Sequence, residues 1–475
     1  MAQPFGYQHE HDFVNLVDNL SEHLKRYQAH FFTETDDSSD LGHAYILGLL
    51  KTEAGKRNLE RMIEEHDTPG DGYQRIQQFI TDSPWSSEAL IRAIAEDTCA
   101  LYAEQPGYRI NDVGYIIDES GHIKSGKHSV GVGRQYAGVV GKVENCQIGV
   151  YASLVWKTHS TLINERLFLP KSWTSDTERC EKAGIPENAR QYKTKLELAL
   201  EMIQADFDAG LEFGWVGGDG LYGHGFEFGN AIENMGLKFF LDIHCDQKIY
   251  RSEPHIEVPP KRSNKGRPPT KPEADLESLE VQHYMQQLRP DQWEQVTVRD
   301  GTKGPITLSV FATKVWVWDG ISETARPRTL AITRNVADNK IKYSLTNFAL
   351  HHAPIERLAY MQAQRYWVER AFQEAKSELG MSDYQVRKWN AWHHHMALVM
   401  LALSFLVKER IVRQETHPLV SCRDVRLLII ALLTQDPEMI QKRLAQMEFR
   451  HEQRRRDIER RRKAAADQHR GLEIK

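Results

Sequence analysis

The spacing of apolar positions predicts helices at the start and the end of the chain, with strands in between. Apolar residues recur every three or four positions over 13–24, which is the period of an α-helix. Further helical patterns follow at 46–62 and 76–80, so we expect residues 1–100 to form a helical N-terminal module. The last part of the chain, 393–475, has helical patterns again and is expected to be a helical C-terminal region.

The middle of the chain combines short, β-prone apolar runs with amphipathic helix patterns. The expected elements are a strand from Val113, strands over 147–156 and 162–169, a helix over 193–207, a strand over 213–216, a helix over 226–235 and a strand over 237–243. Three strands followed by helix, strand, helix and strand is the element order of an RNase H-like fold. We therefore expect an α/β protein with an RNase H-like core.

A polar segment interrupts this core. It is rich in proline at its start, and strand patterns return only later, at 306–318, 329–332 and 342–348. We take 101–245 as the first part of the core and 246–340 as an inserted domain with β-strands and a basic, proline-rich linker. Residues 341–392 then form the second part of the core.

Composition places the chain among soluble globular proteins, because 40% of its 475 residues are apolar and 27% are charged. Its net charge of −5 gives no general attraction to a polyanion, so a nucleic-acid surface has to come from local clusters. One such cluster is the tail, where residues 441–475 hold 12 Lys or Arg against 6 Asp or Glu. We expect this basic helical tail to contact DNA or a second protomer.

The sequence shows none of the signals of secreted or membrane proteins. Its first residues lack the basic and apolar regions of a signal peptide, and the longest apolar run, Met396 to Val407, is shorter than the roughly 20 residues that span a bilayer. The five cysteines are scattered, without the CxxC spacing of a zinc site. We therefore expect a cytoplasmic protein with reduced cysteines.

Three acidic residues are the candidates for chemistry. Asp118 ends an apolar run before a glycine turn, Asp219 follows a second apolar run, and Glu369 lies in a segment of helical periodicity. An acid where a buried strand meets solvent is held rigidly, which suits a metal ligand. Two of the acids also have an ordinary interpretation. Asp118 could start the turn before Gly121 by bonding to the backbone, and Glu369 could form a surface salt bridge with Arg365.

Together, the three acids form a set that can hold two divalent cations for phosphoryl transfer. Carboxylate oxygens are ligands suited to Mg²⁺ and Mn²⁺. Two such ions can activate a water or a 3′-hydroxyl on one side of a phosphodiester and stabilise the leaving oxygen on the other. On one helix, Arg365, Glu369 and Lys376 would share a face, and the two cations could bind the scissile and neighbouring phosphates.

Other basic residues lie in segments typical of DNA-binding surfaces. Lys124, Lys127 and Arg134 follow Asp118 among glycines that allow close backbone approach to a phosphate chain. Arg267 lies beside proline in a segment that resembles an AT-hook, which enters the minor groove of DNA. A flexible basic linker explains that segment at least as well.

Two further motifs have both a functional and a structural interpretation. Residues 72–88 have the pattern of a helix, a turn and a capped helix. This could be a helix-turn-helix that reads DNA with Gln74, Arg75 and Gln78, or part of a plain helical bundle. The run His393–His395 suggests a metal site, but consecutive positions on a helix face different directions, so we expect a structural role.

These motifs jointly resemble the bacterial insertion-sequence transposases of the DDE superfamily, in the lineage with the Y-R-E-K signature, and are most like the IS701 family. The similar stretches are Ile116–Gly121, Gly126–Tyr136, Lys142–Gly149, Leu167–Trp173 and Tyr366–Gly380. By this resemblance Asp118, Asp219 and Glu369 are the catalytic triad. Arg365 and Lys376 are then the Arg and Lys of the signature, with its R-x3-E-x6-K spacing intact.

One position departs from the signature. Its tyrosine falls on Gln362, which leaves open whether Tyr360 or Tyr366 takes over the phosphate contact. The resemblance implies Mg²⁺-dependent cleavage of double-stranded DNA at terminal inverted repeats, joining of the freed 3′-OH to target DNA, and a homodimer or larger synaptic complex. The alternatives are a non-catalytic DNA-binding regulator derived from a transposase and a stand-alone metal-dependent nuclease.

Overall fold

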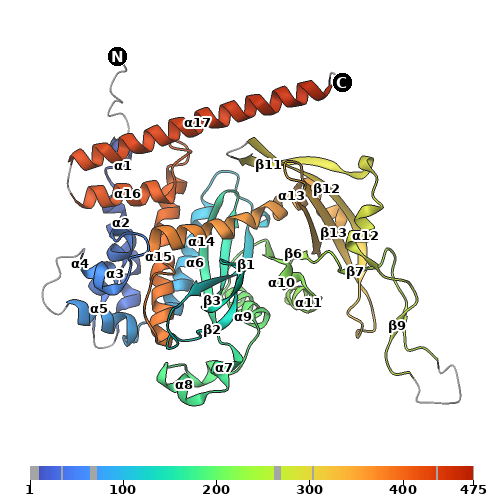
Figure 1. Ribbon diagram of the computed structural model, residues 1–475, viewed down its shortest axis with the longest axis horizontal. Coiled ribbons are helices and arrows are strands. Elements are labelled where there is room, and N and C mark those ends of the chain that lie inside the picture. Colours follow the sequence, from blue (N-terminus) through green and yellow to red (C-terminus); the bar gives the residue numbers. More distant parts are fainter. Residues whose placement is uncertain are drawn as a thin grey trace. The chain divides into compact units, whose positions relative to one another are not determined.

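The computed structural model describes residues 10–33, 36–64, 72–260, 269–301, 304–434 and 437–473 (Figure 1). The chain folds into two compact units, each built from segments that are distant in the sequence. Unit 1 comprises Met1–Arg109, Asp118–Glu212 and Trp367–Arg456, and unit 2 comprises Ile110–Ile117, Phe213–Tyr366 and Asp457–Lys475. Strand β1 (Gly114–Ile123) contributes its first half to unit 2 and its second half to unit 1.

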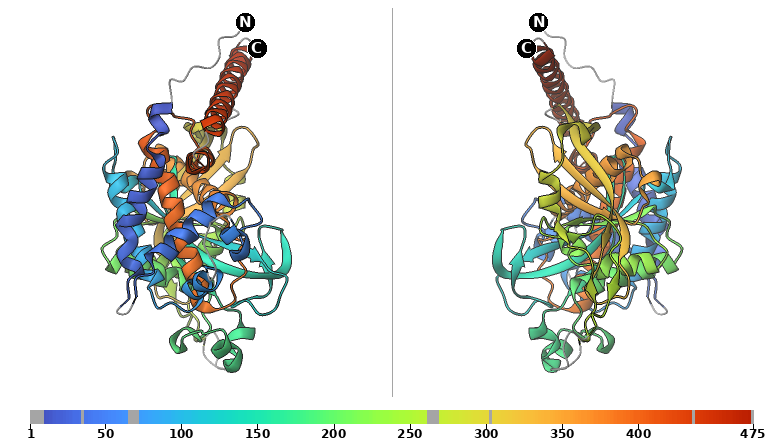
Figure 2. Two further views of the ribbon diagram at one scale, coloured as in Figure 1. Left: turned by 90° about the vertical axis from the view of Figure 1, so that its left-hand side faces the viewer. Right: turned by 90° about the vertical axis from the view of Figure 1, so that its right-hand side faces the viewer.

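Unit 1 is largely helical, and a long apolar helix forms its centre. Helix α15 (Trp389–Val412) is buried on nearly all sides, which explains why its sequence has no polar face. It packs against several helices from the start of the chain, and Figure 2 shows it in orange among these helices in blue. The other helices of this unit are α1 (Glu10–Phe13), α2 (Leu16–Tyr27), α3 (Ser39–Lys51), α4 (Leu59–Glu64), α5 (Gly72–Thr81), α6 (Ser87–Ala103), α7 (Lys171–Thr174), α8 (Thr177–Lys182), α9 (Lys195–Asp208), most of α14 (Tyr366–Leu379), α16 (Cys422–Leu433) and the first part of α17 (Pro437–Glu473).

The strands of unit 1 that follow β1 pair with one another antiparallel. Strand β3 (Lys142–Trp156) pairs with β2 (Gly133–Ala137) along its first residues and with β4 (His159–Phe168) along the rest. It also borders β1. Helix α9 packs on β3 and β4, and it begins at a capping box in which Thr194 and Glu197 bond to each other's backbone. The helix predicted over 193–207 is thereby confirmed.

The main strands of unit 2 pair side by side, some of them parallel and some antiparallel. The first half of β1 lies parallel to β5 (Trp215–Gly218), and β5 lies parallel to β6 (Phe239–Ile243). Antiparallel strands continue from β6 in the order β14 (Ile341–Thr346), β13 (Arg326–Asn335), β12 (Gly304–Val317) and β11 (Glu294–Gly301). The strands predicted at 306–318, 329–332 and 342–348 therefore extend the ladder that contains β5.

Unit 2 also contains the last part of α17, from Asp457, and several short elements. The short helices are α10 (Gly220–Gly223), α11 (Glu227–Asn234), α12 (Val281–Gln286) and α13 (Ile355–Gln364), and the short strands are β7 (Lys248–Ile249), β8 (Ile256–Glu257), β9 (Glu273–Ala274) and β10 (Leu279–Glu280). The expected α/β class is confirmed, with mixed strands and flanking helices. In the described part of the chain, no helix combines the length and the apolar character needed to cross a membrane.

Candidate active site

Asp118 lies inside a strand rather than at its end. The glycine turn expected after it is absent, because β1 continues beyond it. Buried contacts to distant residues hold the continuing strand: His122 Nε2 is 2.8 Å from the Tyr151 hydroxyl, and its Nδ1 is 3.0 Å from the Ser382 hydroxyl. These contacts outweigh the local turn preference of the Ser-Gly pair. The Asp118 carboxylate is half-buried and accepts a hydrogen bond from the N–H of Glu119 at 2.8 Å.

Asp219 lies where the sequence predicts, directly after β5. It is the N-cap of α10, and its carboxylate accepts a hydrogen bond from the N–H of Leu221 at 2.9 Å. Gly223 allows α10 to approach β6, because a Cβ added there would lie 1.8 Å from the Asp242 carbonyl oxygen. The turn that carries Asp219 is therefore fixed closely against β6.

The parallel ladder fixes the positions of these two acids along their strands. Ile116 of β1 pairs with Gly217 of β5. Asp118 is two positions after Ile116, and Asp219 is two positions after Gly217. Both acids therefore follow the paired segments by two positions, Asp118 within β1 and Asp219 directly after β5.

A further acid, Asp242, was not singled out by the sequence analysis. In β6 it directly follows Leu241, which pairs with Gly218, and Asp219 directly follows Gly218. Asp219 and Asp242 are therefore at the same level on neighbouring strands of unit 2. The sequence did contain a signal for Asp242, because the predicted strand 237–243 has an acid near its end. The apolar runs before Asp118 and Asp219 are likewise followed by an acid.

Arg365 contacts Asp242 through an ion pair. Its Nη1 donates to Asp242 Oδ2 at 2.6 Å. The prediction of one continuous helix through Arg365 is wrong, because α13 ends before it and α14 begins after it, with Arg365 as the C-cap of α13. Glu369 and Lys376 lie in the first and last turns of α14. Arg365 itself has helical backbone angles between the two helices (φ −59°, ψ −28°), so a face shared with Glu369 and Lys376 stays a prediction.

Electrostatics connect α14 to Asp118 within unit 1. Burial lowers the pKa of the Lys376 ammonium, and the negative charge of Asp118 raises it in part. Glu369 is exposed. Glu374 on the same helix pairs with Arg370, whose Nη2 lies 3.3 Å from Glu374 Oε1.

Lys124 is held inside unit 1. Its ammonium donates to the Tyr384 carbonyl at 2.7 Å and lies 3.4 Å from the centroid of the Tyr384 ring. Burial lowers the pKa of Lys124 to about 7. The sequence analysis predicted that Lys124 contacts DNA. In this structure its side chain has partners within the chain itself.

The lowered pKa gives a testable dependence of stability on pH. Above about pH 7 the folded protein releases the Lys124 proton, whereas the unfolded chain keeps it until its ordinary pKa of about 10.4. The unfolded state therefore binds more protons in this window, and Lys124 makes stability rise with pH by up to about 1.4 kcal/mol per unit. We expect Lys124→Met to remove this contribution. Urea unfolding at several pH values checks it, and equal slopes in both proteins would contradict it.

The other predicted DNA contacts differ in their surroundings. Lys127 and Arg134 are exposed, and Arg134 Nη2 donates to the Val143 carbonyl at 3.2 Å. Arg267 lies outside the described residues. In the N-terminal helices, α5 buries its apolar positions, while its polar positions Gln74, Arg75 and Gln78 are exposed. This exposure is compatible with both a DNA-reading helix and a plain bundle.

The donor set of the three candidate acids is of the right chemical type for a divalent cation, which prefers carboxylate oxygens. The negative charge of Asp118 also acts on the Lys376 ammonium, as its effect on the pKa of that lysine shows. Over the ranges that the structure describes, no three or more His, Cys, Asp or Glu side chains are grouped as a metal site. The acids thus fit such an ion in chemistry, while a metal site remains a proposal.

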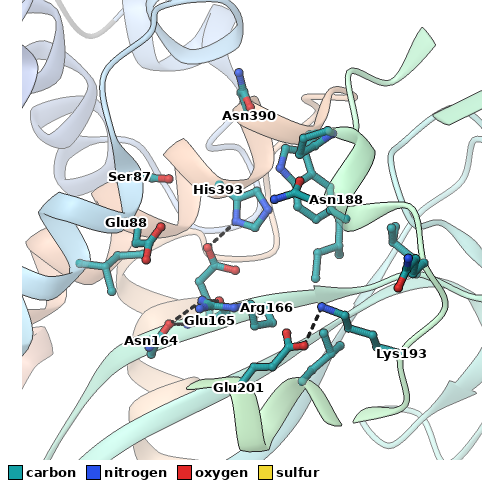
Figure 3. Close-up of a pocket in the computed structure, with 18 residues that line it drawn as sticks. Ser87, Glu88, Asn164, Glu165, Arg166, Asn188, Lys193, Glu201, Asn390 and His393 are labelled. Atoms are coloured by element: carbon teal, nitrogen blue, oxygen red, sulfur yellow. Dashed lines mark hydrogen bonds and ion pairs between the residues drawn. The ribbon is translucent and has the colours of Figure 1, made fainter. Parts of the chain in front are cut away.

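A separate cavity of about 330 Å³ in unit 1 is lined by residues other than the three candidate acids. Figure 3 shows Glu165 and His393 directed toward each other there, with 2.6 Å between Oε1 and Nδ1. The next two histidines have other contacts, since His394 lies near two backbone carbonyls and His395 Nδ1 is 2.8 Å from the Tyr45 hydroxyl. The three histidines therefore face different partners, as expected for structural residues.

Comparisons with known proteins bear on this site. A family model described as DDE superfamily endonuclease matches residues 27–305, a segment that includes Asp118 and Asp219 and ends before Glu369. The chain is also 25% identical over 320 residues to a protein of Microchaete diplosiphon named as the probable transposase for insertion sequence element IS701. That alignment covers 66% of this chain and 69% of the relative.

Proposed function

Because the chain belongs to the DDE superfamily of endonucleases, we propose that it is the DNA transposase of an insertion sequence. In this role it cleaves double-stranded DNA at the terminal inverted repeats of the element and joins the freed 3′-OH ends to target DNA. Asp118, Asp219 and Glu369 are its proposed catalytic residues. The similarity to a probable IS701 transposase supports this choice among the activities of the superfamily.

The observation that carries the proposal is the register of two acids on parallel strands. Asp118 and Asp219 each follow by two positions a residue of the pair Ile116 and Gly217. Side chains at paired positions of parallel strands point to the same face of a sheet. Continuing this pairing by two residues would bring both carboxylates to one face. This is the acid arrangement that an RNase H-like core requires.

The proposed cofactor is Mg²⁺ or Mn²⁺, held by Asp118, Asp219 and Glu369. When bound, such ions supply stabilisation of the charge that develops on phosphodiester oxygens. The residues of the chain bind and orient the DNA. The Arg365 guanidinium offers a planar set of N–H donors to a phosphate, and the Lys376 ammonium acts as a compact positive charge beside the acids.

The rest of the chain is proposed to bind DNA and a second protomer. Exposed Lys127 and Arg134 would contact the phosphate backbone, with Lys124 and Arg267 as further contacts. The N-terminal helices would bind the ends of the element. The basic residues of α17 would contact DNA or the partner in a homodimeric synaptic complex. We place the protein in the cytoplasm.

The test is cleavage of a labelled duplex that carries the terminal repeat of the element. We expect the wild-type protein to nick this duplex in Mg²⁺ or Mn²⁺, to be inactive in EDTA, and to leave a duplex with a scrambled repeat uncut. Binding of the repeat without cleavage in either metal would instead support a DNA-binding regulator. Equal cutting of both duplexes without end joining would support a stand-alone nuclease.

A further inference from the structure

We propose that Asp242 is a positioning residue, which holds the Arg365 guanidinium in the orientation that binds a DNA phosphate beside Asp219. This inference rests on the proposed function, because it assumes that Asp219 and Arg365 act on DNA. It adds a residue outside the predicted triad and outside the predicted phosphate-binding pair. The residues that carry it all belong to unit 2.

The first step is the position of Asp242 in the ladder. Strands β5 and β6 are parallel, and Gly218 pairs with Leu241. Asp242 is the next residue on β6, and Asp219 is the residue directly after β5, so the two acids occupy one level. A side chain that Asp242 holds is therefore held next to the level of Asp219.

The second step is the contacts of the Asp242 carboxylate, which is only 8% exposed. Its Oδ2 accepts from Arg365 Nη1 at 2.6 Å, and its Oδ1 accepts from the Ser344 hydroxyl at 2.8 Å. Ser344 stands opposite Asp242 on β14, and its Oγ also lies 2.7 Å from Gln362 Oε1 on α13. Because both oxygens have a partner from a different element, the orientation of the carboxylate is fixed.

The third step is the charge at this corner of unit 2. Lys342 Nζ lies 3.9 Å from Asp242 Oδ2, so two cationic side chains face one carboxylate. In the proposal, a DNA phosphate contacts Arg365 while the guanidinium stays bound to Asp242.

The physical role follows from the shape of arginine. A long Arg side chain loses rotamer freedom when it is ordered, and this loss weakens binding if it occurs only when the ligand arrives. Asp242 orders Arg365 before DNA binds. An ion pair at Nη1 fixes the plane of the Arg365 guanidinium, and a guanidinium with a fixed plane is suited to recognise a phosphate. Arg365 sits at the junction of α13 and α14, so the ion pair also fixes that junction against β6.

The test is a double-mutant cycle on DNA cleavage with Asp242→Ala, Arg365→Ala and the double variant. We expect the cleavage rate at saturating DNA to fall roughly 10-fold in Asp242→Ala and roughly 100-fold in Arg365→Ala. The double variant should match Arg365→Ala, because Asp242 acts only through Arg365. If the two reductions in cleavage rate multiply in the double variant, the proposal is wrong. A normal cleavage rate in Asp242→Ala would also overturn it.

A conservative variant keeps the test sharp if Asp242→Ala does not fold. Asp242→Asn retains an acceptor for Arg365 and the partner of Ser344, so it should recover most of the rate. Its remaining loss should disappear in an Arg365→Ala background. A purely structural role would instead lower the thermal midpoint of both Asp242 variants in either background.

Equilibrium DNA binding gives a second readout that does not need cleavage. Each phosphate contact adds about 0.9 to the slope of log K against log salt for duplex DNA. Arg365→Ala and Asp242→Ala should each lower this slope by up to that amount, and the double variant by no more than Arg365→Ala. If the wild type binds DNA but never cleaves it, the proposed function fails while this cycle still tests the coupling. If it cleaves and the cycle is additive, only the positioning role fails.

Discussion

Asp219→Asn is expected to reduce metal-dependent cleavage of a terminal-repeat duplex at least about 10³-fold, with Asp118→Asn and Glu369→Gln close behind. An amide of the same shape removes the negative charge that a divalent cation requires. Because removal of any one proposed ligand disrupts the same metal site, the losses should not multiply when two variants are combined. Initial rates of nicking in Mg²⁺, with DNA binding measured in parallel, check this result.

These substitutions are chosen so that folding is preserved. Asp219 caps α10 through the N–H of Leu221, and asparagine caps helices as well as aspartate does. Asp118 keeps an oxygen for the N–H of Glu119 after replacement by Asn. Glu369 is exposed, so its change to Gln leaves packing untouched. Thermal midpoints of the three variants should therefore stay near that of the wild type.

A matched control is available on the neighbouring helix. Glu356 is exposed in the first turn of α13, as Glu369 is in the first turn of α14. Glu356→Gln should leave cleavage unchanged, because Glu356 is not a proposed ligand. Wild-type cleavage by Glu369→Gln would show that another acid completes the site. Loss of DNA binding together with cleavage would show that the charge change acts on the DNA surface instead.

The sequence predicted the strands that carry Asp118 and Asp219 because their apolar runs are local signals. It did not predict that β1 continues past Asp118, since His122 is held by Tyr151 and Ser382, both far along the chain. From the local sequence alone, the Ser-Gly pair favours a turn. Only the buried contacts of the folded chain outweigh that preference for a turn.

The partners of the cationic side chains near the candidate site could not be predicted from the sequence either. The periodicity around Arg365 continues without a glycine or proline, so the break between α13 and α14 left no local signal. The partner of Arg365 is Asp242, 123 positions earlier in the chain. Lys124 likewise has its partner Tyr384 260 positions later. Charge type can be read from a sequence, but the partner that orients the charge depends on contacts between distant segments.

The largest effect on stability is expected at a glutamate on the same helix as Glu369. Glu374 is only 6% exposed, and Arg410 Nη1 lies 3.3 Å and 3.4 Å from its two carboxylate oxygens. The Cys422 thiol donates to Oε2 at 3.3 Å. Burial and then the charge of Glu374 raise the pKa of that thiol well above its ordinary value, so it stays a donor. Three helices, α14, α15 and α16, therefore meet at one carboxylate.

Glu374→Gln should lower the free energy of unfolding by about 3 kcal/mol, because it leaves the guanidinium of Arg410 buried without its counter-charge. Replacing both partners, as Glu374→Gln with Arg410→Met, should recover much of this loss, because the buried charge is then gone as well. Glu369→Gln is the matched control, and as an exposed change on the same helix it should alter stability by less than about 0.5 kcal/mol. Urea unfolding followed by circular dichroism measures all three. An unchanged midpoint for Glu374→Gln would mean that the surrounding helices hold Arg410 without the charge.

Cleavage should show the opposite order of effects. Glu369→Gln should be inactive, while the folded fraction of Glu374→Gln should be active. This result would distinguish a catalytic glutamate from a structural one five residues along the same helix.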